Sequence, residues 1–224
     1  MSDSNQSFAS ISRKVITALA GLFLITFLAV HLSTNLLMLK PDNGATFGKA
    51  VKFMTTNPLI KVMEVVLFSG FFIHILLGIF VTLRNWAARP VGYKVTQRSY
   101  TYFMSKYMIH TGVIIFIFLL LHLWHFYAIK MGVAPKNEVM KDVHDFYPLA
   151  VKYFQMPLFS FGYIIVFIFL GFHLNHALQS GFQTLGLNHN KYTPAVKMIS
   201  TIYAIIVAIG FSVIPVYFLF IYKG

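Results

Sequence analysis

The amino-acid sequence predicts an all-α integral membrane protein with five transmembrane helices in a bundle. Two observations support this fold class. Hydrophobic residues make up 58% of the 224 residues and charged residues only 11%, whereas roughly a quarter of the residues in soluble domains are charged. The chain also contains five apolar runs of about 20 residues or more, the length that a helix needs to cross a hydrocarbon core of roughly 30 Å. We expect residues 1–224 to form a single transmembrane domain.

The five predicted helices follow from these runs and from the polar segments between them. The first run stops at the turn-forming cluster that begins at Lys40 and Pro41. The fourth begins at Pro157, where a missing amide hydrogen costs little, and the fifth contains Pro215, which should bend it. The predicted ranges are residues 15–39, 61–83, 107–129, 157–179 and 196–222.

The distribution of charge argues against a nucleic-acid partner and indicates an orientation. The net charge is +12, but the basic residues lie in short segments between the apolar runs rather than along one face. Lysine and arginine together divide evenly between the two sides of the bilayer and do not orient the chain. All four arginines, however, fall on the side that holds the amino terminus, which predicts that this side, called the inner side below, is cytoplasmic. They are Arg13, Arg84, Arg89 and Arg98.

Histidines inside the apolar runs are the most informative feature of the sequence. A polar ring in hydrocarbon is costly unless it is paired, so such residues are candidates for function. One of them alone could be a hydrogen-bonded contact between helices, but each of the first four predicted helices carries at least one. These seven of the nine histidines are His31, His74, His110, His122, His125, His173 and His176.

The depth of each histidine can be counted, because a helix advances about 1.5 Å per residue and consecutive spans run in opposite directions. His31 and His122 lie about 16 and 15 residues from the inner ends of their helices. His74 and His173 lie about nine and six residues from theirs. The histidines therefore form an outer pair, His31 with His122, and an inner pair, His74 with His173, at levels roughly 12 Å apart.

Two imidazoles at one level suit the iron of an electron-transfer haem, which takes two strong axial ligands from opposite faces and keeps no open position. We therefore expect two stacked haem b groups, with His31 and His122 on one iron and His74 and His173 on the other. Chains without cysteine, such as this one, cannot ligate an iron–sulfur cluster through thiolates. Any such cluster must belong to a partner.

Other histidines remain alternatives. His125 and His176 each follow a favoured ligand by three residues and lie on a nearby helix face, but their levels match the proposed partners less well. His110 lies near the inner end of its helix and is expected to contact headgroups, a haem propionate or a quinone. Glycines near the ligands either pack helices together or leave room for a flat macrocycle; they are Gly70, Gly78 and Gly171.

Glu64 is the only carboxylate within an apolar run, near the outer end of the second predicted helix. It lies close to the level of the outer pair. Quinone chemistry moves two protons with two electrons, so a quinone pocket needs a group that exchanges protons. Glu64 is a candidate for that role; the alternative is an ion pair with Lys61 or Lys52 at the membrane surface.

Five segments together resemble the diheme cytochrome b family of succinate:quinone oxidoreductases with a single membrane subunit, as found in Gram-positive bacteria and epsilon-proteobacteria. The resemblance covers essentially the whole chain and rests on the order and spacing of these segments rather than on any one of them. They are SRK before the first helix, VHLSTN around His31, FFIHILLGIF around His74, LLLHLWHFY around His122 and GFHLNHALQSGFQTLG around His173.

The resemblance implies that His31 and His122 bind the haem distal to the soluble subunits and that His74 and His173 bind the proximal one. It implies a flavoprotein with covalent FAD, which interconverts succinate and fumarate, and an iron–sulfur subunit on the cytoplasmic face of a bacterial inner membrane. Such complexes can associate further. It also implies that menaquinone, or another quinone, reacts near the distal haem with the help of a carboxylate placed as Glu64 is. This respiratory complex II serves electron transport and the tricarboxylic acid cycle.

Two other functions remain open from the sequence. The chain could be a diheme cytochrome b anchor for another dehydrogenase, such as a hydrogenase or a formate dehydrogenase, and the identity of the companion subunits would distinguish the two. It could also be a proton-coupled transporter in which the histidines form a relay. Such a transporter would show no Soret absorbance.

Overall fold

The computed structural model describes the backbone of residues 2–87 and 100–223, and the side chains of residues 12–87 and 107–223. These residues form helices joined by loops, with no strand among them. Five of the described helical segments are long and apolar enough to cross a membrane, which confirms the predicted fold class. Arg89 and Arg98, which helped to orient the sequence, lie outside the described residues.

The spanning helices extend a few residues beyond the predicted ranges, because polar flanking residues continue each helix outside its apolar run. The largest difference is at the start of the chain, where the polar segment before residue 15 is already helical. The main helices are α1 (Ser2–Leu36), α3 (Pro58–Ala87), α4 (Tyr100–His122), α7 (Pro157–Thr184) and α8 (Thr193–Val216).

Three spans end in a short segment of different helical geometry. A 3-10 turn, Leu37–Leu39, follows α1. A π-helical turn, Leu123–Tyr127, leads from α4 into α5 (Ala128–Lys130). A second π-helical turn, Tyr217–Ile221, follows α8 just after Pro215, where the sequence predicts a bend. A π turn adds one residue to the helical repeat and changes which face the following residues occupy.

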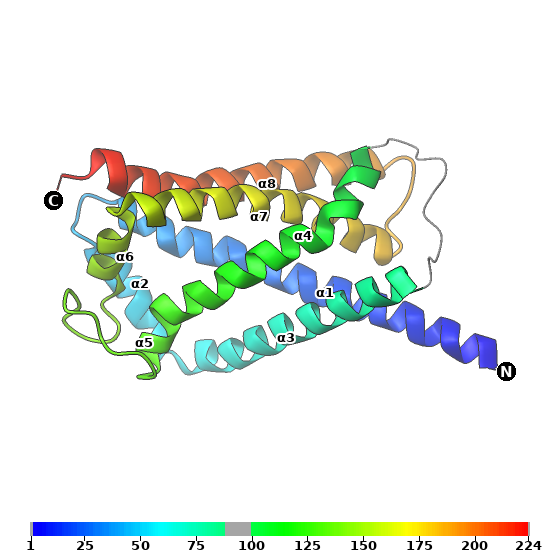
Figure 1. Ribbon diagram of the computed structural model, residues 1–224, viewed down its shortest axis with the longest axis horizontal. Coiled ribbons are helices and arrows are strands. Elements are labelled where there is room, and N and C mark those ends of the chain that lie inside the picture. Colours follow the sequence, from blue (N-terminus) through cyan, green and yellow to red (C-terminus); the bar gives the residue numbers. More distant parts are fainter. Residues whose placement is uncertain (1, 88–99, 224) are drawn as a thin grey trace.

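Four of the spans form a ring in cross-section. α1 packs against α3 and α7, and α4 packs along α7 and touches α3 less extensively. α1 and α4 therefore face each other across one diagonal of the ring, and α3 and α7 across the other. α8 packs on α7 and α1 from outside this ring. The spans alternate in direction, and the two termini lie at opposite ends of the bundle (Figure 1).

Two short helices at the C-terminal end of the bundle were not predicted from the sequence. They are α2 (Ala45–Thr56) and α6 (Phe146–Phe154), and both lie beside the ends of the spans (Figure 1). Their apolar stripes are too short to be distinguished from loops by length. Gly44 precedes α2 with a φ of +81°, and any side chain at this position would overlap the ring of Tyr147 in α6. This close approach joins the two short helices.

Close helix contacts hold the bundle together on one side. Lipid tails are as apolar as leucine, so packing rather than burial alone drives helix association in a membrane. At Gly171 a Cβ atom would lie 3.1 Å from Ala208 Cβ of α8, and at Gly210 it would lie 2.9 Å from Leu32 of α1. By contrast, α3 has no buried residue along its whole length. The bundle is therefore packed closely around α7 and α8 and loosely at α3.

Candidate functional site

The structure brings together the same two histidine pairs that the depth count predicts. The ring centres of His31 and His122 lie 5.9 Å apart, with the ring planes inclined by 86°. Those of His74 and His173 lie 6.4 Å apart, with the planes inclined by 78°. No hydrogen bond links the two rings of either pair. Each pair spans one diagonal of the ring, α1 to α4 for the outer pair and α3 to α7 for the inner pair.

Aromatic side chains surround the outer pair. Phe27 stacks on the His31 ring with a centre-to-centre distance of 5.4 Å and an interplanar angle of 21°. Phe118 stacks on His122 in the same way, at 5.7 Å and 24°. Other rings that lie within 6.4 Å of one of the two imidazoles are Phe211, Phe126 and Tyr163. The outer imidazoles are thus held in an apolar, rigid environment.

Glycines and one hydroxyl group surround the inner pair. A Cβ atom on Gly21 of α1 would lie 3.4 Å from Cε1 of His74, and a Cβ atom on Gly112 of α4 would lie 3.6 Å from Cε1 of His173. The hydroxyl of Thr111 lies 3.1 Å from Nδ1 of His173. Neither inner imidazole contacts an aromatic ring other than its partner within the described part of the chain.

The glycines in contact with the inner imidazoles differ from the three that the sequence suggests, although the space beside one of those three, Gly78, is open. Gly171 packs α7 on α8, and a Cβ atom on Gly70 would lie 3.3 Å from the ring of Phe23, so both serve helix packing. A Cβ atom on Gly78 would meet no atom within 4 Å. Gly21 and Gly112 lie on helices other than those of the histidines that they face, and a search along each histidine's own helix therefore misses them.

The geometry of both pairs fits two imidazoles on one haem iron. The two ring centres would then lie about 6 Å apart, because each metal–nitrogen bond is roughly 2 Å and each nitrogen lies about 1 Å from its ring centre. The measured separations, 5.9 and 6.4 Å, agree with this distance. Nδ1 of His74 and Nδ1 of His122 are buried without a hydrogen-bond partner in the described residues, but so is Nδ1 of His125, so the ring separations alone carry the fit.

Two ligands at each level would not hold a bare metal ion. Groups of three or more His, Asp or Glu side chains able to bind such an ion are absent from the described residues. A haem iron needs only two protein ligands, because the macrocycle supplies the others. The donor set therefore fits a haem better than a free metal ion, and ligation by these four histidines stays a prediction.

The other histidines of the apolar runs lie outside the two pairs. The His125 ring packs between Tyr153 and Phe159, at 5.1 and 5.3 Å, and does not contact His31. The His176 ring makes no ring contact with His74 among the described residues. His110 is exposed near the N-terminal end of α4, 5.6 Å from Tyr107. The structure therefore favours His122 over His125 as the partner of His31. It likewise favours His173 over His176 as the partner of His74.

Glu64 forms a cluster with Tyr127 and Lys130, which follow His122 in the sequence. The Tyr127 hydroxyl donates a hydrogen bond to Oε1 of Glu64 at 2.5 Å, and Nζ of Lys130 lies 2.7 Å from Oε2. The side chains of Lys130 and Glu64 are only 13% and 21% exposed. Glu64 is thus paired with Lys130, and not with Lys61 or Lys52, the partners considered from the sequence.

Depth counting places Glu64 and Lys130 at the outer ends of their spans, but it does not show that they meet. What the count misses is rotation about the helix axis. The π turn that ends at Tyr127 precedes Lys130 and sets the face that both side chains occupy. Donors on both carboxylate oxygens, one of them a cation, stabilise the charged form of Glu64.

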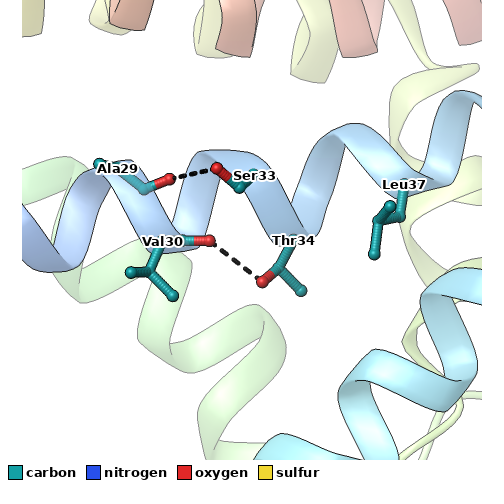
Figure 2. Close-up of a pocket in the computed structure, with 5 residues that line it drawn as sticks. All are labelled: Ala29, Val30, Ser33, Thr34 and Leu37. Atoms are coloured by element: carbon teal, nitrogen blue, oxygen red, sulfur yellow. Dashed lines mark hydrogen bonds between the residues drawn. The ribbon is translucent and has the colours of Figure 1, made fainter.

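A shallow hollow of about 350 Å³ lies along the outer half of α1 (Figure 2). The hydroxyl groups of Ser33 and Thr34 are directed back to the α1 carbonyls of Ala29 and Val30, at 2.8 and 3.0 Å. Their hydrogens are thus not available to a ligand, and the hollow has no reactive group. The residues around it are Ala29, Val30, Ser33, Thr34 and Leu37.

Comparison of the chain with known protein families, with characterised proteins and with solved structures gives no match.

Proposed function

We propose that this chain is the membrane-embedded cytochrome b subunit of a succinate:quinone oxidoreductase, a succinate dehydrogenase or fumarate reductase. In this role it transfers electrons between an iron–sulfur subunit and a quinone. The observation that carries the proposal is the presence of two histidine pairs on the two diagonals of one helix ring, with ring centres 5.9 and 6.4 Å apart. A transporter relay would not require opposed pairs at two levels.

In this proposal each imidazole pair holds one haem b. His31 and His122 bind the outer haem, and His74 and His173 bind the inner one. The haems supply reversible one-electron chemistry. In each pair the two imidazoles would hold the haem iron between them, and the apolar helix ring would exclude water from it.

The quinone site in this proposal lies at the Glu64 cluster. Reduction of a quinone consumes two electrons and two protons, and Glu64, Tyr127 and Lys130 offer a carboxylate, a phenol and an ammonium group within one hydrogen-bonded set. Tyr127 follows the outer ligand His122 by one π turn, and the Phe68 ring lies 4.9 Å from that of Tyr127. Menaquinone or a related quinone would be the substrate.

The partners in this proposal are a flavoprotein with FAD and an iron–sulfur subunit, bound on the side that holds the amino terminus. This side would face the bacterial cytoplasm. Arg13 and Arg84 support this orientation, because both lie at the same end of the bundle, where the Arg13 guanidinium lies 5.1 Å from the centre of the Phe80 ring. The absence of cysteine requires that another subunit carry any iron–sulfur cluster.

A pyridine haemochrome assay on the complex purified from membranes, with peptide identification of its companion subunits, tests the proposal. The expected result is two b haems per chain with bis-imidazole spectra, together with a flavoprotein and an iron–sulfur protein. If the haems are present but the companion is a hydrogenase or a formate dehydrogenase, the chain is instead the cytochrome b anchor of that enzyme. A colourless preparation would reject haem binding and favour the transporter.

A further inference from the structure

One side-chain hydrogen bond reaches a paired histidine from a different helix. Thr111 of α4 lies with its hydroxyl oxygen 3.1 Å from Nδ1 of His173 on α7. No other described side chain makes such a contact from another helix to one of the four paired rings. His74 also has a contact from another helix, with the backbone of Thr17 on α1, but among the described residues only His173 has a side-chain partner of this kind.

The Thr111 hydroxyl has one hydrogen and can accept as well as donate. It donates this hydrogen to the backbone carbonyl oxygen of Met108, at 2.9 Å, and a carbonyl oxygen can only accept. With its hydrogen on that carbonyl, the hydroxyl oxygen accepts from His173, and this arrangement places a hydrogen on Nδ1. A neutral imidazole has one ring hydrogen, so the other nitrogen, Nε2, keeps a free lone pair.

The neighbouring residue supports the same arrangement. A Cβ atom on Gly112 would lie 3.6 Å from Cε1 of His173, so α4 approaches the imidazole edge with a hydroxyl at one residue and no side chain at the next. A larger residue in place of glycine would extend into the space beside the ring. Thr111 and Gly112 therefore both lie against the edge of the His173 ring.

The outer pair has no equivalent contact. Asn35 lies on the same helix as His31, and its amide nitrogen donates to the His31 carbonyl at 2.7 Å and is 3.5 Å from the ring nitrogen Nδ1. An amide nitrogen can only donate, so it cannot accept a hydrogen from Nδ1. Nδ1 of His74 and Nδ1 of His122 have no partner within the described residues.

We propose that Thr111 is a positioning residue that holds His173 in the tautomer with hydrogen on Nδ1, and so presents Nε2 as the iron ligand of the inner haem. This inference rests on the proposed haem function. An acceptor on the far nitrogen of a ligating histidine fixes the ring and makes it a stronger base, and loss of such a partner typically lowers metal affinity about 10- to 100-fold. A stronger base also favours the oxidised metal.

The test compares Thr111→Val with Thr111→Ser in the complete complex. Redox titration of the two spectral components should show that Thr111→Val shifts the inner one to a more positive potential and lowers the affinity of the inner haem at least about 10-fold. The outer component should not move, and Thr111→Ser should behave as the unmodified protein. Thr26→Val is a matched control, because the Thr26 hydroxyl bonds only to a carbonyl of its own helix. An unchanged inner component in Thr111→Val would overturn the proposal.

A second measurement does not depend on haem. Nitrogen-15 NMR of the full chain without haem, with labelled histidine and with the His173 signals assigned by loss in His173→Gln, reports which ring nitrogen carries hydrogen. We expect Nδ1–H at His173 and its loss in Thr111→Val. Nε2–H in the unmodified chain would overturn the proposal even where two haems bind. Nδ1–H in a chain that binds no haem would instead reject the proposed function and leave the hydrogen bond established.

Discussion

The outer and inner histidine pairs share one arrangement but differ in what surrounds them. Around the outer pair, His31 and His122 each stack on a phenylalanine of their own helix, and further rings fill the space. Around the inner pair, Gly21 and Gly112 leave space open and Thr111 supplies a hydroxyl group. The outer pair also lies near the charged cluster at Glu64. In the proposed function, identical ligands in these two surroundings should give haems with different properties, because hydrogen bonds and polarity near the ligands tune a metal site.

Loss of a ligand is expected to have the largest effect and tests whether the two levels are separate sites. His122→Leu should remove the outer spectral component, and His74→Leu the inner one, each leaving one haem per chain. The reason is that each variant would remove one of the two histidines that hold a haem. Visible spectra and haem-to-protein ratios of the purified variants measure the result.

His125→Leu and His176→Leu are matched controls, because each histidine lies three residues beyond a candidate ligand and outside both pairs. Both variants should keep two haems. If His122→Leu removed both components or neither, the separation into two levels would be wrong.

The second largest effect concerns the outer level alone. Glu64→Gln should lower quinone turnover at least about 100-fold, the usual range for loss of a proton-exchanging group, while both haems remain bound. Tyr127→Phe should lower it less, because one of the two donors to Glu64 remains. Electron transfer to a water-soluble menaquinone analogue, measured beside the haem content, gives the result.

Glu138→Gln is the control for this experiment, because Glu138 is an exposed carboxylate in the loop after α5. Its turnover should equal that of the unmodified complex. Full quinone turnover in Glu64→Gln would place the quinone elsewhere in the complex.

The two levels also show how much the sequence can predict. The depth of His31, His74, His122 and His173 follows from a constant rise per residue, so both pairs could be predicted before the fold was known. Lateral neighbours depend on the rotation of each helix about its axis. The contacts of Gly21 with His74, and of Lys130 with Glu64, were therefore not predictable, and the π turn at Leu123–Tyr127 adds a change of register that no apolar pattern reveals.

The short helices at the C-terminal end were missed for a related reason. α2 depends on an aspartate before its first turn and on the contact of Gly44 with Tyr147 of α6. Neither the cap nor this distant contact produces an apolar run, and apolar runs were the signal from which the helices were predicted. Whether such short helices form depends on contacts between single residues that are far apart in the sequence.

The third prediction tests the open space at the inner level. Gly21→Ala adds a methyl group at an ordinary contact distance from His74, 3.4 Å, and alanine favours a helix over glycine by about 0.5–1 kcal/mol. In the chain without haem, Gly21→Ala should therefore be as stable as the unmodified protein or slightly more stable. Gly21→Val, by contrast, should reduce the occupancy of the inner haem while the outer haem remains.

Gly162→Val is the matched control, because Gly162 is exposed on α7 and a Cβ atom there meets nothing within 4 Å. Haem content per chain and thermal unfolding of each variant are the measurements. Equal inner-haem occupancy in Gly21→Val and in Gly162→Val would contradict the role of Gly21 in shaping the inner level.

The smallest expected effect concerns α2, which lies at the same end of the bundle as the outer pair. Oxygens of Asp42 accept hydrogen bonds from the backbone amides of Gly44 and Thr46, at 3.1 and 2.9 Å, and from the Thr46 hydroxyl. The bond from this hydroxyl is the main reason that the pKa of Asp42 lies below its ordinary value. The charged carboxylate therefore stabilises the folded state above the ordinary carboxyl pKa of about 3.9, and this contribution is lost as the pH falls through the lowered pKa.

Asp42→Asn should accordingly lower the melting temperature slightly at pH 7, and the difference from the unmodified protein should shrink as the pH falls below about 4. Asparagine keeps one accepting oxygen, so the variant removes the charge together with the hydrogen bonds that the second oxygen accepts. If α2 helps to shield the outer level, only the outer spectral component should change in this variant at neutral pH. A change in the inner component, or a difference in stability that grows as the pH falls, would show that Asp42 acts through something other than the start of α2.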